Sequence, residues 1–158
     1  MKIKVLNDLH LGVQRSAGTT VSSRQALHAF QIQQLHNLLN EDYQNIDYVL
    51  INGDLFDTFN VSTSVFFDTF RVFKGFLMRK GSPKLIFSEG NHDLSKDNQK
   101  ISSLRLLYAI LAEEHEVTYI SEKPVNFSAQ ILIVPHIRRQ EDFEEHLETL
   151  CEQTEPLP

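Results

Sequence analysis

The sequence contains one cysteine, no tryptophan and no long hydrophobic run. Cys151 has no second cysteine to pair with, which excludes an internal disulfide and favours a reducing, cytoplasmic setting. The longest apolar runs, such as residues 131–134, are far shorter than the roughly 20 residues that span a bilayer. The N-terminus becomes polar at Asn7 and Asp8, so it lacks the apolar core of a signal peptide. We therefore expect a cytoplasmic protein without membrane contacts.

Positive charge is also scarce, because 15 Lys and Arg residues stand against 21 Asp and Glu residues and the net charge is −6. Bulk electrostatic attraction to nucleic acid is therefore excluded, and any contact with a polyanion must use a local basic patch or bound cations. The composition is otherwise that of an ordinary globular protein, with 41% hydrophobic residues over 158 positions. We expect residues 1–158 to form a single domain around one core.

Short apolar runs alternate along the chain with segments of helical periodicity. Strands are expected at residues 3–6, 47–52, 84–88, 117–120 and 130–134. Helices are expected at residues 24–41, 64–78, 100–113 and 140–151. The apolar side chains expected to face inward from the second helix are Phe66, Phe67, Phe70, Phe73 and Leu77. This alternation predicts an α/β fold with a mainly parallel sheet flanked by helices.

Polar clusters follow three of the expected strands, at residues 8–10, 53–57 and 90–93. The carboxyl ends of parallel strands share one edge of a sheet, so these clusters should surround one crevice. Carboxylate, imidazole and amide groups are suitable donors for Mn²⁺, Fe²⁺ or Zn²⁺. Gly53 and Gly90 precede the candidate ligands and allow the backbone to turn sharply and to approach an ion closely. Each cluster alone is common in turns, but their order and placement together predict a metal site.

The three clusters read D-x-H, G-D-x-x-D and G-N-H-D. They resemble the first three signature blocks of the calcineurin-like metallophosphoesterase superfamily. Asp-Leu-His-Leu-Gly at residues 8–12, Gly-Asp-Leu-Phe-Asp at 53–57 and the strand and proline at 133–138 are similar to the SbcD-type branch of DNA repair nucleases. The resemblance implies the front part of a β-sandwich with outer helices. It also implies a DNA exonuclease or endonuclease subunit that acts in repair or recombination with an SbcC-type ATPase.

By this resemblance, two divalent metals bind at the crevice, with Mn²⁺ expected ahead of Fe²⁺, Zn²⁺ or Mg²⁺. Asp8 and His10 bind the first metal, Asp54 bridges both metals, and Asn91 binds the second. His92 is the catalytic residue, which stabilises the transition state or protonates the leaving oxygen. Two metals polarise the phosphodiester and lower the pKa of a bound water, which is the chemistry of phosphodiester hydrolysis.

Asp57 and Asp93 match family positions that orient the metal ligands or cap their loops. The family's later Gly-His and Gly-His-x-His blocks, which supply three further histidine ligands, are absent here. His136 follows an expected strand and is the candidate substitute ligand, although a packing role is favoured. We expect the chain to be the N-terminal section of a metallophosphoesterase domain. A second copy or a protein partner should then cover the open side of its sheet.

Local phosphate contacts are expected from three basic residues near the crevice, namely Arg15, Lys96 and Lys100. Solvated loop ends are the competing interpretation of all three. Two alternatives to a DNA nuclease remain at this point. One is a phosphatase or small phosphodiesterase of the same superfamily, and the other is a non-catalytic module that uses the fold to bind a partner.

Overall fold

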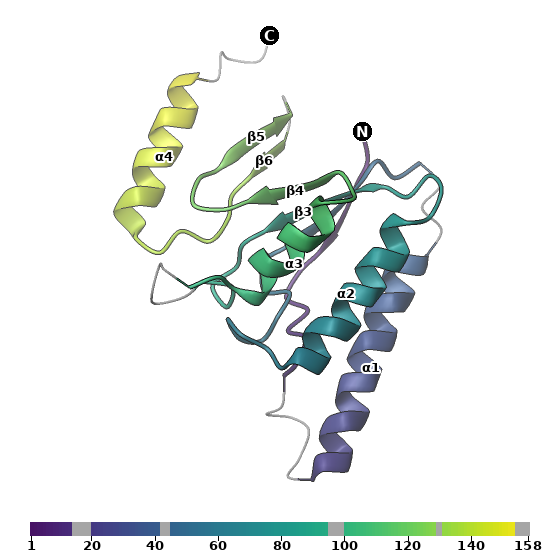
Figure 1. Ribbon diagram of the computed structural model, residues 1–158. Helices are drawn as coiled ribbons and strands as arrows, with labels where there is room; N and C mark the ends of the chain where they lie inside the picture. Colours follow the sequence, from purple (N-terminus) through teal and green to yellow (C-terminus); the bar gives the residue numbers. More distant parts are fainter. Residues whose placement is uncertain (14–19, 42–44, 95–99, 129–130, 154–158) are drawn as a thin grey trace.

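The computed structural model describes residues 1–13, 20–41, 45–94, 100–128 and 131–153, with side chains described up to residue 149. Strands and helices alternate along the first two thirds of the chain, and a hairpin and a last helix follow (Figure 1). The strands are β1 (Ile3–Leu6), β2 (Tyr48–Asn52), β3 (Lys84–Ser88), β4 (Val117–Ile120), β5 (Val125–Ser128) and β6 (Ile131–Ile133). The helices are α1 (Val21–Asn40), α2 (Thr63–Leu77), α3 (Ser103–Ala112) and α4 (Gln140–Gln153).

Strands β1 to β4 form one parallel sheet in the order β1-β2-β3-β4. The register pairs Leu6 with Ile51 and Asn52 with Ser88, so the carboxyl ends of β1, β2 and β3 lie side by side. Connections between adjacent parallel strands are made by α1, α2 and α3, which lie together on one side of the sheet (Figure 1). The predicted α/β fold with a parallel sheet flanked by helices is confirmed.

Side chains alternate between the two faces of the sheet, and each face packs against its own hydrophobic core. On the helix side, Phe87 from β3 packs edge-on against Phe73 from α2, with 5.3 Å between ring centroids. On the other side, Leu50 and Ile86 pack with Ile133 from the two-stranded antiparallel sheet β5–β6. The hairpin therefore covers part of the second face. Of this hairpin only the second strand was predicted, because residues 125–128 alternate apolar and polar side chains over too short a run.

Side-chain caps decide where the first three helices begin. Thr20, Ser62 and Ser102 each accept a hydrogen bond from a backbone N–H three residues later. Such caps satisfy amide groups that have no partner within the helix. Helix α1 consequently begins three residues before the predicted start, and α3 begins three residues after it.

The inward face of α2 differs from the prediction. Phe67 is 54% exposed, whereas Phe76 is fully buried beside Phe73. The buried stripe runs through Val65, Thr69, Phe73 and Phe76, which is the 3.6-residue period, and Phe67 falls outside it. Phe67 was expected to face inward because phenylalanine is apolar, and that expectation was wrong. Among the described helices, none combines the length and hydrophobicity needed to cross a bilayer.

Candidate metal centre

The loops after β1 and β2 are joined by backbone hydrogen bonds where the strands end. The N–H of His10 donates to the carbonyl of Asp54 at 3.0 Å, and that of Leu11 donates to Leu55 at 2.8 Å. The loop after β2 is joined to β3 in turn, because Gly53 donates to the Ser88 carbonyl at 3.0 Å. The three polar clusters therefore belong to one connected edge of the sheet.

Two groups of potential ligand atoms lie at this edge. Asp8, His10 and Asp54 each bring one ligand atom within 4.8 Å of the other two. His10, Asp57 and His92 form a second group by the same measure, so His10 is common to both. Two ligands of one small cation lie at most about 4.4 Å apart, because metal–ligand bonds are about 2.0–2.2 Å long, so only small side-chain adjustments are needed for one ion to contact all members of a group. The edge therefore brings together the predicted ligands of the first metal.

The backbone at these residues is unusual. Asp8, His10 and Asp54 have φ values of 51°, 44° and 49°. Residues other than glycine rarely adopt this left-handed region, and such strain tends to concentrate at functional sites. Gly53, at φ 81°, supplies the turn that was expected of it. Of the five described non-glycine residues with positive φ, these three make up the first ligand group, and only Asn45 and Glu122 lie elsewhere.

Gly90 allows the loop after β3 to approach Asp54. A Cβ atom at Gly90 would lie 2.8 Å from Cγ of Asp54 and closer still to its carboxylate oxygen and backbone nitrogen. The backbone N–H of His92 donates to Oδ1 of Asp54 at 2.9 Å. Asp54 itself is only 7% exposed. The lack of a Cβ at Gly90 is therefore what permits the close approach of this loop to the candidate ligand Asp54.

Asp93 holds this arrangement from inside the protein. Its Oδ2 accepts hydrogen bonds from the backbone N–H groups of Asp54 at 3.1 Å and Gly90 at 2.9 Å. Burial raises the pKa of Asp93 to about 7, and the Asp54 carboxylate adds to the rise while the two backbone hydrogen bonds oppose it. This geometry matches the loop-capping and orienting role expected for Asp93.

Asp57 connects the two histidines. Its backbone carbonyl accepts a hydrogen bond from Nδ1 of His92. Its carboxylate lies 3.5 Å from Nδ1 of His10, but this nitrogen is buried and has no hydrogen bond. The His10 and His92 rings are in edge contact, with 4.7 Å between centroids. A buried imidazole nitrogen that lies near the Asp57 carboxylate but makes no hydrogen bond fits a cation site, because burial removes its hydrogen bond to water without a replacement.

Gln31 on α1 was not predicted as part of the site. Its Nε2 donates to the His10 carbonyl at 3.0 Å, and its Oε1 accepts from the Gly12 N–H at 3.2 Å. The side-chain amide thus holds both ends of the strained turn at His10. The sequence carries no local signal for this contact, because the partners are about twenty residues apart.

The remaining predicted residues lie around this edge or outside the described part of the chain. Asn91 is exposed in the loop between Gly90 and His92. His136 binds the Glu89 carbonyl through its backbone N–H at 2.8 Å, and its side chain lines a neighbouring cavity. Neither described ligand group contains it. Lys100 also lines this cavity, while Arg15 and Lys96 lie outside the described residues.

The donor set fits a divalent cation. Asp8 and Asp54 provide carboxylate oxygens, and His10 provides an imidazole nitrogen. Oxygen and imidazole ligands together suit Mn²⁺, Fe²⁺ and Zn²⁺, whereas metals such as Cu⁺ prefer thiolate ligands.

Comparison with known families agrees with this geometry. A family model described as calcineurin-like phosphoesterase matches residues 1–155. No curated protein matches the chain. The matched range contains the parallel sheet, the three loops at its edge and both ligand groups. The family model thus covers nearly the whole chain, including the edge with the candidate metal ligands, and the chain is a member of the calcineurin-like phosphoesterase family.

Proposed function

We propose that the chain is the metal-binding part of a DNA phosphodiesterase of the SbcD type. Family membership and the Asp and His clusters already indicate a metal-dependent phosphoester hydrolase. The observation that carries the proposal further is the position of His92, whose ring touches His10 beside the Asp8 and Asp54 carboxylates. The sequences Asp-Leu-His-Leu-Gly and Gly-Asp-Leu-Phe-Asp at the same loops favour the DNA-directed branch.

In the proposed mechanism, Asp8 and His10 would hold one divalent ion, Asn91 would contribute to a second, and Asp54 would contribute to both. When bound, the ions supply positive charge for the phosphate oxygens and make a bound water more acidic. Mn²⁺ is the proposed metal. Asp54 is kept in place by the N–H of His92, and Asp93 fixes the backbone on both sides of the contact.

His92 handles the proton of the leaving group in this mechanism. Because Nδ1 is hydrogen-bonded to the Asp57 carbonyl, Nε2 is the nitrogen that can exchange a proton with the substrate. With the His92 ring protonated on both nitrogens, water oxygen forms a bond to phosphorus, the ester P–O bond breaks, and the leaving oxygen takes the proton of Nε2. The attacking water releases one proton to solvent, and the ring takes up a proton again before the next turnover. The products are a phosphate monoester and an alcohol.

The proposed SbcD-type branch and the exposed apolar side chains each suggest a partner of this chain. An SbcC-type ATPase is the proposed functional partner, and Arg15, Lys96 and Lys100 are proposed to contact DNA phosphates. Val5 on the edge strand β1 is 48% exposed, and Leu132 on β6 is 42% exposed. These exposed apolar side chains support the binding of a second copy or a protein partner over β1 and the β5–β6 hairpin.

The test measures Mn²⁺-dependent cleavage of linear DNA and of bis(4-nitrophenyl) phosphate by the purified chain. Asp54→Asn and His92→Ala should lower kcat for both substrates, by roughly 100-fold or more for the proton donor. His36→Ala, at an exposed position on α1, is the matched control and should keep wild-type rates. Cleavage of the chromogenic ester without DNA cleavage would replace the proposal with a small phosphodiesterase. Mn²⁺ binding without any cleavage would favour a partner-binding module.

A further inference from the structure

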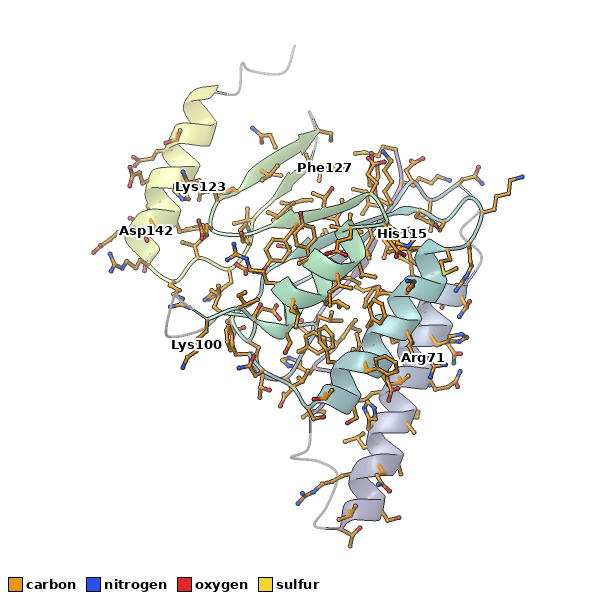
Figure 2. The ribbon with its side chains drawn as sticks, in the orientation of Figure 1. Arg71, Lys100, His115, Lys123, Phe127 and Asp142 are labelled. Carbon is orange, nitrogen blue, oxygen red and sulfur yellow. The ribbon has the colours of Figure 1, made fainter. Side chains whose placement is uncertain are left out.

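A cavity of about 290 Å³ lies next to the metal centre at the carboxyl edge of the sheet. The loop after β3, the start of α3 and the segment after β6 form its walls. Lys100, just ahead of α3, and Asp142, in the first turn of α4, also line it and are labelled in Figure 2. This volume is near the lower limit of small-molecule sites and would hold one nucleoside or a group of similar size.

The floor of the cavity is shared with the metal centre. Asp93 lines the cavity and also binds the backbone of Asp54 and Gly90. Its second oxygen, Oδ1, is buried and has no hydrogen-bond partner among the described residues. Glu89, which accepts a hydrogen bond from the hydroxyl of Tyr119, lines the cavity beside it. A ligand with N–H or O–H groups would satisfy the unpaired acceptor.

The walls and rim add two other kinds of group. Phe59, Leu94 and Ile137 provide an apolar wall that includes one aromatic ring. The cationic side chains at the cavity are Lys100, Arg105 and Arg138, and they alternate with the exposed acids Glu122 and Asp142. The carboxylates of the floor would repel a simple anion, and the three cations would repel a simple cation. None of the cavity's carboxylates belongs to a described metal-ligand group.

We propose that this cavity binds the nucleoside adjacent to the scissile phosphate. A nucleoside phosphate combines a flat ring for Phe59, hydrogen-bond donors for Asp93 and a negative group for Arg105. Aromatic rings bind bases of any sequence, because every base has a π-face. The cavity thereby makes the metal edge selective for nucleotide esters over simple phosphate esters. The inference rests on the proposed phosphodiesterase function for its biological use, but the binding step does not depend on catalysis.

Binding is tested first, without turnover. Titration calorimetry of the full chain with thymidine 5′-monophosphate should show tighter binding than with 2-deoxyribose 5-phosphate, which lacks the base. Phe59→Leu keeps an apolar side chain and removes the ring, and it should weaken thymidine monophosphate binding roughly fivefold, the low end of aromatic stacking. Phe67→Leu, at an exposed ring on α2, is the matched control and should bind as wild type does.

Turnover is tested second, with the thymidine 5′- and 3′-(4-nitrophenyl phosphate) esters and bis(4-nitrophenyl) phosphate as substrates with Mn²⁺. Wild type should have a lower KM for at least one thymidine ester, and Phe59→Leu should raise that KM while leaving the KM for bis(4-nitrophenyl) phosphate unchanged. Equal binding of the two monophosphates, or equal effects of Phe59→Leu on all esters, would overturn the cavity assignment. Absence of all hydrolysis with base-dependent binding intact would instead overturn the proposed function and leave the nucleoside site standing.

Discussion

Gly90→Ala places the smallest side chain at the contact between the loop after β3 and the Asp54 ligand. The new Cβ would lie 2.8 Å from Cγ of Asp54, whereas ordinary contacts of this kind begin at 3.4 Å. Restoring an ordinary contact requires Cγ and the loop to separate by about 0.6 Å, and the carboxylate oxygen, which is closer to the Cβ, must move further. Because metal–ligand distances tolerate only about 0.2 Å, Asp54 would no longer bind the metal in its present position.

We expect this variant to bind Mn²⁺ roughly 100-fold more weakly than wild type, or not measurably, since displacing a ligand exceeds the usual effect of losing a supporting contact. Overpacking should also lower the free energy of unfolding by about 1–3 kcal/mol. Gly75→Ala is the matched control, because a Cβ there meets nothing within 4 Å. Gly75 lies within α2, so alanine should stabilise the protein by about 1 kcal/mol and leave Mn²⁺ binding unchanged.

The assay combines Mn²⁺ titration calorimetry, urea unfolding and circular dichroism on the three proteins. Circular dichroism separates a folded protein that has lost its site from one that has not folded. If Gly90→Ala is folded and binds Mn²⁺ with wild-type affinity, Asp54 is not a metal ligand in the geometry described here.

Three further predictions use other contacts. Gln31→Met removes both hydrogen bonds to the His10 turn and should weaken Mn²⁺ binding roughly tenfold in calorimetry. Gln33→Met, on the exposed side of α1, should leave Mn²⁺ binding unchanged. Equal Mn²⁺ affinities of the two variants would exclude a positioning role for Gln31. Phe73→Ala should lower the free energy of unfolding in urea by about 3–5 kcal/mol, since the ring is fully buried against β3, and a loss below about 1 kcal/mol would contradict this packing. For the metal-free protein, the raised pKa of Asp93 means that the folded state binds more protons than the unfolded state between the ordinary value of 3.8 and about 7. Its free energy of unfolding should therefore fall as pH rises through this window, and Asp93→Asn should flatten that dependence; an unchanged slope in the variant would assign the effect to another group.

The part of the fold that depends on local periodicity was predictable from the sequence. Parallel strands and the helices between them follow from short apolar runs that alternate with helical repeats, and the sheet has that order. Exact helix starts depend on capping residues such as Thr20 and Ser102, and the spacing of apolar residues does not identify these caps. The exposure of Phe67 shows that residue type alone does not decide burial, because the period of the helix determines which side chains face the sheet.

The juxtaposition of Asp8, His10 and Asp54 was also predictable, because it needs only that parallel strands end at a common edge. Contacts that depend on exact loop paths were not predictable. Gln31 reaches His10 from another element, and Gly90 lies close against Asp54. Such contacts join residues far apart in sequence and leave no pattern in a single chain.

In the proposed metal centre, Asp54 holds a divalent metal at the carboxyl edge of the sheet. Electron paramagnetic resonance of free Mn²⁺, titrated with wild-type protein and with Asp54→Asn, tests it most directly. Wild-type protein should reduce the intensity of the free Mn²⁺ resonance, whereas Asp54→Asn should leave most of that intensity. Asp68→Asn, on α2, should reduce it as wild type does. Equal binding by wild type and Asp54→Asn would contradict the claim.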